Sequence, residues 1–221
     1  MQILNVPSGK PLSWYLDYEL EVLQHINDYP DGAFFTWIVA PSVIYGRHQI
    51  KEQEVNIPYC EQNGIAVFQR KSGGGCVYAD EGNIMLSHIT PSTHAEQVFQ
   101  QFLNTLASAL QSMGLNAVTT AHNDILVDGY KVSGNACYTQ QQGTIVHGTL
   151  LYDVDLNRMQ HAITPSAEKL EKHGIQSVRQ RVCNIKPLIQ TSVRQLTDQI
   201  SDFRFQISEL FCQSLTNYSS L

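Results

Sequence analysis

The chain has 221 residues, of which 43% are hydrophobic, so it is long enough for one large domain with a buried core and too apolar for a disordered protein. Its net charge of -6 argues against a nucleic-acid-binding protein, because such proteins are usually basic. No apolar run approaches the roughly 20 residues of a membrane span, and the first residues lack the basic and apolar segments of a signal peptide. We therefore expect a cytoplasmic protein with neither a membrane nor a nucleic acid as partner.

The five cysteines form no recognisable metal site or disulfide framework. They are widely spaced, and no Cys-x-x-Cys pair or Cys/His cluster has the spacing of a zinc site. Reduced thiols packed in the interior are the simplest expectation for such cysteines.

The first third of the chain predicts one helix followed by short strands. Residues 13–26 carry leucines at helical spacing, which indicates an amphipathic helix. The β-prone residues that follow are interrupted by Pro41 and later by a run of glycines. Strands are therefore expected within 34–46 on both sides of Pro41, and within 65–70, 76–80 and 82–89.

A long amphipathic helix is predicted to begin near residue 93. Thr93 and Glu96 have the spacing of a capping box, and Gly114 is typical of the end of a helix. Between them, apolar residues recur on one helical face, which indicates packing against a core. These residues are Val98, Phe102, Leu106, Ala109, Leu110 and Met113.

The second half of the chain predicts a meander of strands and then helices. Short β-prone segments run through 117–155, and the Asp-Gly pair at 128–129 between alternating apolar residues is a strong hairpin signal. A short helix is expected over 165–173, and helical residues over 192–215, in one piece or in two around Asp202. Because regular βαβ alternation is absent, we expect an α+β fold with a mixed or antiparallel sheet flanked by helices.

Three consecutive glycines, Gly73–Gly75, follow Arg70 and Lys71 and join two predicted strands. They match neither the phosphate-binding loop G-x-x-x-x-G-K-[ST] nor the dinucleotide motif G-x-G-x-x-G between a strand and a helix. Glycine costs conformational entropy on folding, so a bare backbone here indicates either a ligand that approaches the main chain or a tight structural turn. These residues alone leave both interpretations open.

A second group of polar residues surrounds the predicted hairpin. Lys131 lies in the returning strand, and the small residues Ser133 and Gly134 would leave room for a substrate beside it. Asn123 and Asp124 supply an amide and a carboxylate, which suit a hydroxyl group, a carboxyl group or Mg²⁺. An isolated lysine on a strand is, however, often only a solvated side chain.

Two further segments carry residues that are able to bind or catalyse. His147 and Gly148 begin a predicted strand, and Arg179 and Arg181 share one face if their segment is extended. A histidine can act as an acid or a base, but a packed or surface histidine is the more common case. Two arginines on one face are compatible with a phosphate-binding site and also with a solvent-exposed edge of the sheet.

In this order, the segments resemble the lipoate–protein ligase family of the biotin/lipoate protein ligase superfamily. The glycine run, the G-x-K-[IV]-S-G element and H-G-T-L-L are highly specific to these ligases and their acyltransferase relatives, and SVRQRV favours the ligases. The resemblance rests on PSVIYGRHQ (41–49), EVN (54–56), RKSGGGCVYADEGNIMLS (70–87), NDILVDGYKVSGNA (123–136), HGTLLYDVDL (147–156) and KLEKHGIQSVRQRVCNI (169–185).

The resemblance implies a fold shared with biotin ligases and with the catalytic cores of class II aminoacyl-tRNA synthetases. Proteins of this kind use ATP, with Mg²⁺ as cofactor, to activate lipoate as lipoyl-adenylate, and they release pyrophosphate. They then transfer the lipoyl group to a lysine of an apo lipoyl domain in the E2 subunit of a 2-oxoacid dehydrogenase, or to the glycine-cleavage H protein.

The resemblance also implies roles for individual residues. Lys131 would be the catalytic cation that contacts the lipoyl carbonyl and the α-phosphate, and Asp124 would help to hold the adenylate or Mg²⁺. The family's usual arginine pair is replaced by Gln69 and Arg70, so one cationic contact is lost or is supplied by Lys71. Substrate binding would involve Arg70, Ser72, Gly73, Gly74, Gly75, Asn123, Ser133, Gly134, His147 and Gly148, and nucleotide binding Tyr78, Asn83, Asp124, Lys131, Arg179 and Arg181.

Two other activities are compatible with the same motifs. An octanoyl- or lipoyltransferase of the superfamily would use a cysteine thioester and no ATP, with Cys76 or Cys137 as nucleophile, the latter helped by Lys131 as a nearby cation. A lipoate-binding protein without catalysis is the third reading, and the joint presence of Arg70, the glycine run and Lys131 argues against it.

Residues 1–221 are expected to form one lipoate ligase catalytic domain. Many ligases of the family carry a further C-terminal accessory domain, and this chain stops about where that domain would begin. A separate small chain is the expected source of that part if activation needs a covering element.

Overall fold

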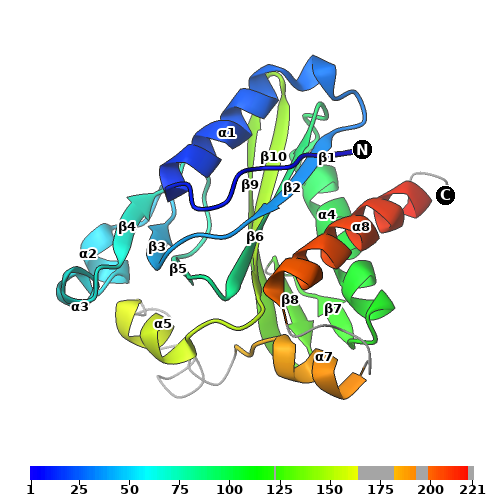
Figure 1. Ribbon diagram of the computed structural model, residues 1–221. Coiled ribbons are helices and arrows are strands. Elements are labelled where there is room, and N and C mark those ends of the chain that lie inside the picture. The colour runs from blue at the N-terminus through cyan, green and yellow to red at the C-terminus, as the bar shows by residue number, and fades with distance from the viewer. Residues whose placement is uncertain (122, 164–181, 193–198, 219–221) are drawn as a thin grey trace.

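A seven-stranded mixed sheet lies at the centre of the computed structural model, which describes residues 1–121, 123–163, 182–192 and 199–218 (Figure 1). Its strands are β1 (Gln2–Ile3), β2 (Ala33–Trp37), β6 (Asn83–Thr90), β7 (Ala117–Thr119), β8 (Asp124–Val127), β9 (Tyr130–Gln140) and β10 (Gly143–Leu151). Their order is β1-β2-β6-β10-β9-β8-β7, with only β1 and β2 parallel among these pairs. The meander predicted over 117–155 forms β7–β10, which are four of the seven strands of this sheet.

A three-stranded sheet lies beside the large one, in the order β4-β3-β5 (Figure 1). β3 (Ser42–Tyr45) runs parallel to β4 (Ala66–Gln69) and antiparallel to β5 (Val77–Ala79). The chain leaves the large sheet after β2, passes Pro41 and enters the small sheet, so the break predicted at this proline is confirmed. The glycine run joins β4 to β5. Two short helices connect β3 to β4, namely α2 (Lys51–Glu54) and α3 (Ile57–Gln62).

Helices cover both faces of the large sheet (Figure 1). On one face, the Tyr15 ring of α1 stacks on Trp37 of β2 at a centroid distance of 4.6 Å. On the other, Phe211 of α8 stacks on Phe34 at 4.3 Å. Successive residues Phe34 and Phe35 thus enter two different cores, and both are fully buried. The remaining helices are α1 (Leu12–Gln24), η1 (Ile26–Asp28), α4 (Ala95–Ser112), α5 (Leu156–Ala162), α7 (Lys186–Ser192) and α8 (Ile200–Tyr218).

The capping box predicted for α4 is wrong. The helix begins at Ala95 after His94, and no side chain caps its first turn. Thr93 therefore lies one residue before the cap position, and Glu96 lies one residue too early in the helix to bond back to it. The apolar face of the helix is confirmed, because Phe102, Leu106 and the other predicted core residues are buried.

The C-terminal helices also differ from the prediction in their boundaries. α8 starts at Ile200 and passes through Asp202 without a break. An aspartate in the first turn of a helix is favoured by the partial positive charge there, so Asp202 marks the start of a helix. α7 carries Pro187 in its own first turn, where the missing N–H is not needed. The helix predicted over 165–173 lies outside the described residues.

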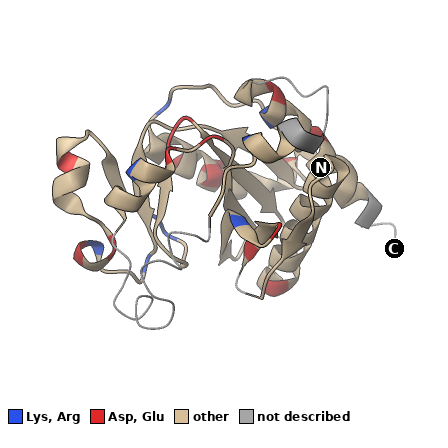
Figure 2. Ribbon diagram, turned by 90° about the horizontal axis from the view of Figure 1, so that it is seen from below, with Lys and Arg blue, Asp and Glu red and all other residues tan. Residues whose placement is uncertain are grey.

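The predicted hairpin and the distribution of charge complete the fold. Asp128 and Gly129 have φ angles of 49° and 84° and connect β8 to β9, so the Asp-Gly turn is confirmed. Over the described elements, Lys and Arg positions are interspersed with Asp and Glu (Figure 2). None of the described helices combines the length and the apolar character needed to cross a bilayer.

Candidate active site

A cavity of about 290 Å³ opens where α1, the small sheet and β8–β10 meet. Leu16, Trp37 and Ile44 form an apolar part of its wall, and Arg70 and Lys131 bring positive charge to it. An apolar wall combined with cations suits a ligand that has an apolar chain and an anionic end. The other lining residues are Gly74, Gly75, Cys76, Val77, Met85, Asn123, Asp124, Gly134, Asn135, Ala136, His147, Gly148 and Thr149.

Arg70 organises the glycine loop. Its Nε donates to Ser72 Oγ at 3.0 Å, and its Nη2 donates to the carbonyl oxygens of Gly73 and Gly75 at 2.6 and 2.7 Å. Nη1 donates to the carbonyl of Ile44 at 3.1 Å, which ties the loop to β3. Burial lowers the pKa of the guanidinium group, yet an arginine stays charged at neutral pH. The loop is thus folded around a buried cation whose partners are neutral oxygens.

The glycines of this loop have different reasons to be glycine. Gly74 has a φ of 88°, and a side chain there would also meet Arg70 Nη2 at 2.9 Å. A methyl group at Gly46 would overlap the carbonyl oxygen of Gly74. A side chain at Gly73, by contrast, would enter open space. Gly74 is therefore required by the tight turn of the backbone. The absence of a side chain at Gly73 leaves open space beside the loop.

A chain of hydrogen bonds at the cavity wall links the glycine loop to α1, β2, β6 and β10. Ser72 Oγ lies 2.6 Å from His147 Nε2, and His147 Nδ1 lies 3.1 Å from Glu19 Oε2 of α1. The Ser87 hydroxyl donates to Glu19 Oε1 at 2.6 Å and accepts from Trp37 Nε1 at 2.8 Å. Because an ionised carboxylate only accepts, Glu19 holds His147 with Nδ1 as the donor and Nε2 toward Ser72.

Lys131 reaches the cavity because of a β-bulge. The register between β8 and β9 pairs Leu126 with Lys131 and leaves Val132 as the extra residue. Val132 is buried in the core, whereas Lys131 Nζ lies 2.7 Å from Asp124 Oδ1, with the two side chains 35% and 27% exposed. Lys131 lies so close to Gly134 that a Cβ there would be 3.2 Å from its Cε and Nζ. The solvated-strand reading of Lys131 is therefore disfavoured.

The turn before Asp124 has an unusual backbone. Asn123 has a φ of 68°, in the left-handed region that asparagine tolerates better than most residues. The Nδ2 group of Asn135 donates to the carbonyl oxygen of Asn123 at 3.0 Å. The cavity wall thus contains an asparagine that supports this turn.

The comparison with protein-family models decides which family this cavity belongs to. The model of the lipoyl protein ligase A/B catalytic domain matches residues 12–204, which contain all the lining residues. The chain belongs to this ligase family. Lipoate–protein ligase 1 of Staphylococcus aureus is 41% identical over 160 residues, which are 72% of this chain and 49% of that protein. The chain therefore spans about half the length of this curated relative.

Solved structures of ligases confirm the expected α+β fold. A lipoate-protein ligase A bound with ATP superposes with a TM-score of 0.79 at 22% identity, over 97% of this chain and 85% of that one. The bi-partite lipoate protein ligase of Thermoplasma acidophilum, reported with its E2 lipoyl domain, gives 0.78 at 23% identity, over 97% and 83%. At these identities the likeness concerns the fold.

Most of the residues expected to bind substrate in a ligase come together in the cavity. Ser72 and Ser133 are buried and lie behind its wall, where they contact His147 and Asn135. Gly73 belongs to the loop but is not part of the lining. The expected residues that line the cavity are Arg70, Gly74, Gly75, Asn123, Asp124, Lys131, Gly134, His147 and Gly148.

Two of the expected nucleotide-binding residues, Tyr78 and Asn83, do not line this cavity. Tyr78 is 1% exposed within a core cluster of the small sheet, and burial, followed by the nearby Asp80 carboxylate, raises the pKa of its hydroxyl. Asn83 is fully buried. Arg179 and Arg181 lie outside the described residues, so their role stays a prediction.

Of the two candidate nucleophiles of a transferase, only one reaches the cavity. Cys137 is not among the lining residues, and burial raises the pKa of its thiol. It lies six positions from Lys131 on an extended strand, which is about 20 Å, so the expected help from that cation is wrong. Cys76 does line the cavity. All five cysteines are free thiols, but only Cys60 is fully buried, so the expected packing in the interior is confirmed for that residue alone.

Three residues of the cavity and its hydrogen bonds have no role predicted from the sequence, namely Glu19, Trp37 and Asn135. Glu19 carried a signal, because it follows Tyr15 by four positions and precedes Leu23 by four on the apolar face of a predicted helix. A carboxylate in such a stripe is buried only when it has partners. Asn135 lies inside NDILVDGYKVSGNA (123–136), one of the segments that resemble the ligase family. No local sequence pattern distinguishes Trp37.

Proposed function

We propose that this chain provides the catalytic pocket of a lipoate–protein ligase, which activates lipoate with ATP and transfers it to a protein lysine. The observation that carries the proposal is the Lys131 amine in a cavity that has an apolar wall on one side and the glycine loop on another. The names of its relatives support the same activity.

In the first step, the lipoate carboxylate attacks the α-phosphorus of ATP, and the bond to pyrophosphate breaks. Negative charge gathers on the phosphate oxygens, so a fixed cation and main-chain N–H groups are the main means of lowering the barrier. Lys131 supplies the cation, and the glycine loop supplies the main-chain donors. Arg70 contributes mainly by holding that loop, because its side chain donates to four main-chain or hydroxyl oxygens there and in β3.

In the second step, the amine of the acceptor lysine attacks the acyl carbon, AMP leaves, and the amine loses a proton. An oxyanion forms on the acyl carbonyl, and Lys131 is placed to stabilise it. A mixed anhydride is already activated, so no cysteine nucleophile is needed. This agrees with the raised pKa of the Cys137 thiol.

The apolar part of the cavity suits the lipoyl tail. Leu16, Trp37 and Ile44 offer it an apolar surface. The Trp37 indole N–H already donates to Ser87, so the ring presents its carbon atoms without leaving a polar group unpaired.

The residues of this site would bind Mg²⁺ only together with the phosphate groups of the nucleotide. Among the described residues there is no group of three acidic, histidine or cysteine side chains that could hold a metal ion. Asp124 is the carboxylate that would hold it, since Mg²⁺ is usually bound by one or two carboxylates together with substrate phosphates. When bound, the ion would neutralise charge on the triphosphate.

We also propose the partners and the compartment. The acceptor is an apo lipoyl domain of an E2 subunit or the glycine-cleavage H protein, in keeping with the E2 lipoyl domain named with the Thermoplasma ligase. That ligase is bi-partite, so a separate accessory chain is the proposed helper for ATP activation. Free thiols are the state that the cytoplasm maintains, which supports a cytoplasmic location.

The experiment that tests this function is incubation of the chain with lipoate, ATP, Mg²⁺ and an apo lipoyl domain, read by intact mass. We expect the acceptor to gain one lipoyl group only when ATP is present. A second reaction starts from preformed lipoyl-adenylate, and we expect it to be the faster one, because closure around ATP is then not required. Modification without any adenylate or ATP would contradict the proposal.

A further inference from the structure

Asn135 pairs with Gly148 in the sheet and lies at the edge of the cavity next to the turn that carries Asp124. Its Nδ2 group donates to the carbonyl oxygen of Asn123 at 3.0 Å, and its Oδ1 accepts from the Ser133 hydroxyl at 3.2 Å. Because a carbonyl oxygen only accepts hydrogen bonds, the Asn135 amide must turn its Nδ2 end toward Asn123. Its Oδ1 is then left for the hydroxyl of the buried Ser133.

The turn that Asn135 holds needs support. Asn123 has a φ of 68°, which a residue with a Cβ adopts only when its surroundings favour it. The next residue, Asp124, is tied on the other side, because its N–H donates to Thr120 Oγ1 at 3.3 Å and its carbonyl accepts from the Thr120 N–H at 3.0 Å. Asp124 thus has one anchor on Thr120 and, through Asn123, a second on Asn135.

We propose that Asn135 is a positioning residue: by holding Asn123 it aims the Asp124 carboxylate, and through that carboxylate the Lys131 amine, at the reacting group. The 2.7 Å contact between Asp124 and Lys131 is the link on which this depends. The inference rests on the proposed function, in which Lys131 stabilises the charge of the reaction. Since Asn135 acts through other residues, its loss should slow acyl transfer more than it weakens the binding of lipoyl-adenylate.

Gly148 gives an independent test of where the Asn135 side chain lies. A methyl group at Gly148 would overlap Asn135 Oδ1, whereas Phe102 Cε1 would be at an ordinary contact distance of 3.6 Å. The glycine of the His-Gly pair is therefore required by the Asn135 side chain. Removing that side chain should make room for alanine at 148.

The first measurement is a single-turnover rate of acyl transfer from preformed lipoyl-adenylate to an apo lipoyl domain. We expect Asn135→Ala to lower this rate about 10-fold, and to raise the half-saturating adenylate concentration by a clearly smaller factor. Asp124→Ala should be at least as slow, and the double variant should be no slower than Asp124→Ala. The control is Gln140→Ala on the same strand, whose amide donates to Tyr138 instead.

The second measurement is thermal stability, which needs no activity. Gly148→Ala should lower the melting temperature of the wild type clearly, and should change it little in an Asn135→Ala background. If the effects of Gly148→Ala and Asn135→Ala on the melting temperature add, or if those of Asp124→Ala and Asn135→Ala on the rate add, the positioning role is overturned. The proposed function would be unaffected by either result. A wild-type chain that transfers nothing from lipoyl-adenylate would contradict the proposed function, and would overturn the positioning role of Asn135 with it.

Discussion

Glu19 Oε2 of α1 lies 3.1 Å from His147 Nδ1 of β10, so a carboxylate on the first helix fixes a histidine on the central sheet. The Glu19 side chain is 3% exposed, whereas His147 is 13% exposed and lines the cavity. Through His147, the same carboxylate reaches Ser72 at the start of the glycine loop. One helix and two sheets are thereby held in one arrangement around the pocket.

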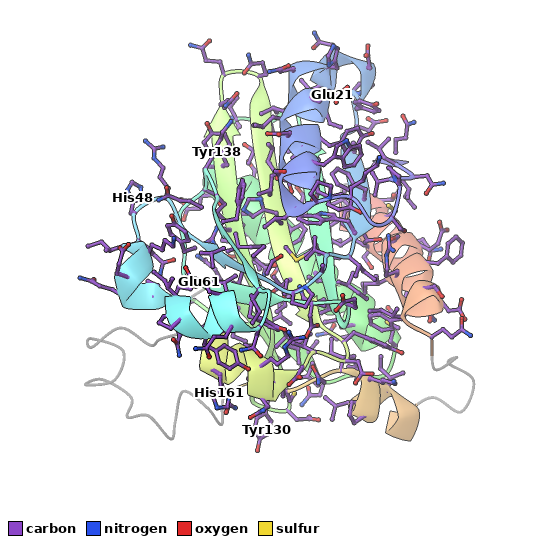
Figure 3. All side chains as sticks on the ribbon, turned by 60° about the vertical axis from the view of Figure 1, so that its left-hand side comes forward. Glu21, His48, Glu61, Tyr130, Tyr138 and His161 are labelled. Carbon is purple, nitrogen blue, oxygen red and sulfur yellow. The ribbon has the colours of Figure 1, made fainter. Side chains whose placement is uncertain are left out.

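Replacement of Glu19 tests this arrangement. In Glu19→Gln the charged acceptor is lost, so His147 is no longer held in one tautomer, and we expect the KM for lipoate to rise by about 10-fold. Glu21→Gln is the matched control, because Glu21 lies exposed on the outer side of the same helix (Figure 3). Equal KM values for the two variants would show that the buried contact has no role in binding.

Lys131→Ala should remove the cation that both steps need. We expect acyl transfer to fall by about 100-fold or more, with the fold intact by circular dichroism. Lys10→Ala is a suitable control, because Lys10 lies over the Trp14 ring on the surface, 5.9 Å from its centroid. Near-normal transfer by Lys131→Ala would return this residue to the class of solvated lysines.

The thiols separate a ligase from a thioester-forming transferase. We expect Cys76→Ser and Cys137→Ser to keep most of their activity, because neither thiol is needed for an adenylate mechanism. The Cys76→Ser variant is the more stringent test, since Cys76 lines the cavity. Complete loss in one variant, together with an acyl adduct trapped on that cysteine in the wild type, would favour the transferase.

His88 makes stability depend on pH. It is 4% exposed, its Nδ1 has no hydrogen-bond partner among the described residues, and burial lowers its pKa from 6.5 to about 4. Between these two values the unfolded chain binds a proton that the folded chain does not, so stability falls as the pH falls from about 6.5 toward 4. The slope is about 1.4 kcal/mol per pH unit.

Urea unfolding at pH 7 and pH 5 measures this loss. We expect His88→Phe to remove most of the difference, because phenylalanine does not bind a proton. Its ring would fill the site by packing against Phe102 and Phe211, which His88 already contacts. If the variant loses as much stability between the two pH values as the wild type does, other groups cause the effect.

The sequence predicted the parts of this structure whose causes are local. The Asp-Gly turn at 128–129 needs positive φ angles, and the apolar face of α4 needs only helical spacing, so both were predictable. The contact between Glu19 and His147 joins residues 128 positions apart, and no local pattern encodes it. Cys137 and Lys131 are close in sequence but far apart on an extended strand.

The measurement that tests the account most directly is acyl transfer from preformed lipoyl-adenylate to an apo lipoyl domain, without ATP, followed by intact mass. Mixtures with and without the chain are compared at equal times. We expect the wild-type chain to add one lipoyl group much faster than the uncatalysed reaction, and Lys131→Ala to lose most of this acceleration. A wild-type rate equal to the uncatalysed rate would contradict the central claim that this cavity binds the acyl-adenylate and delivers its acyl group.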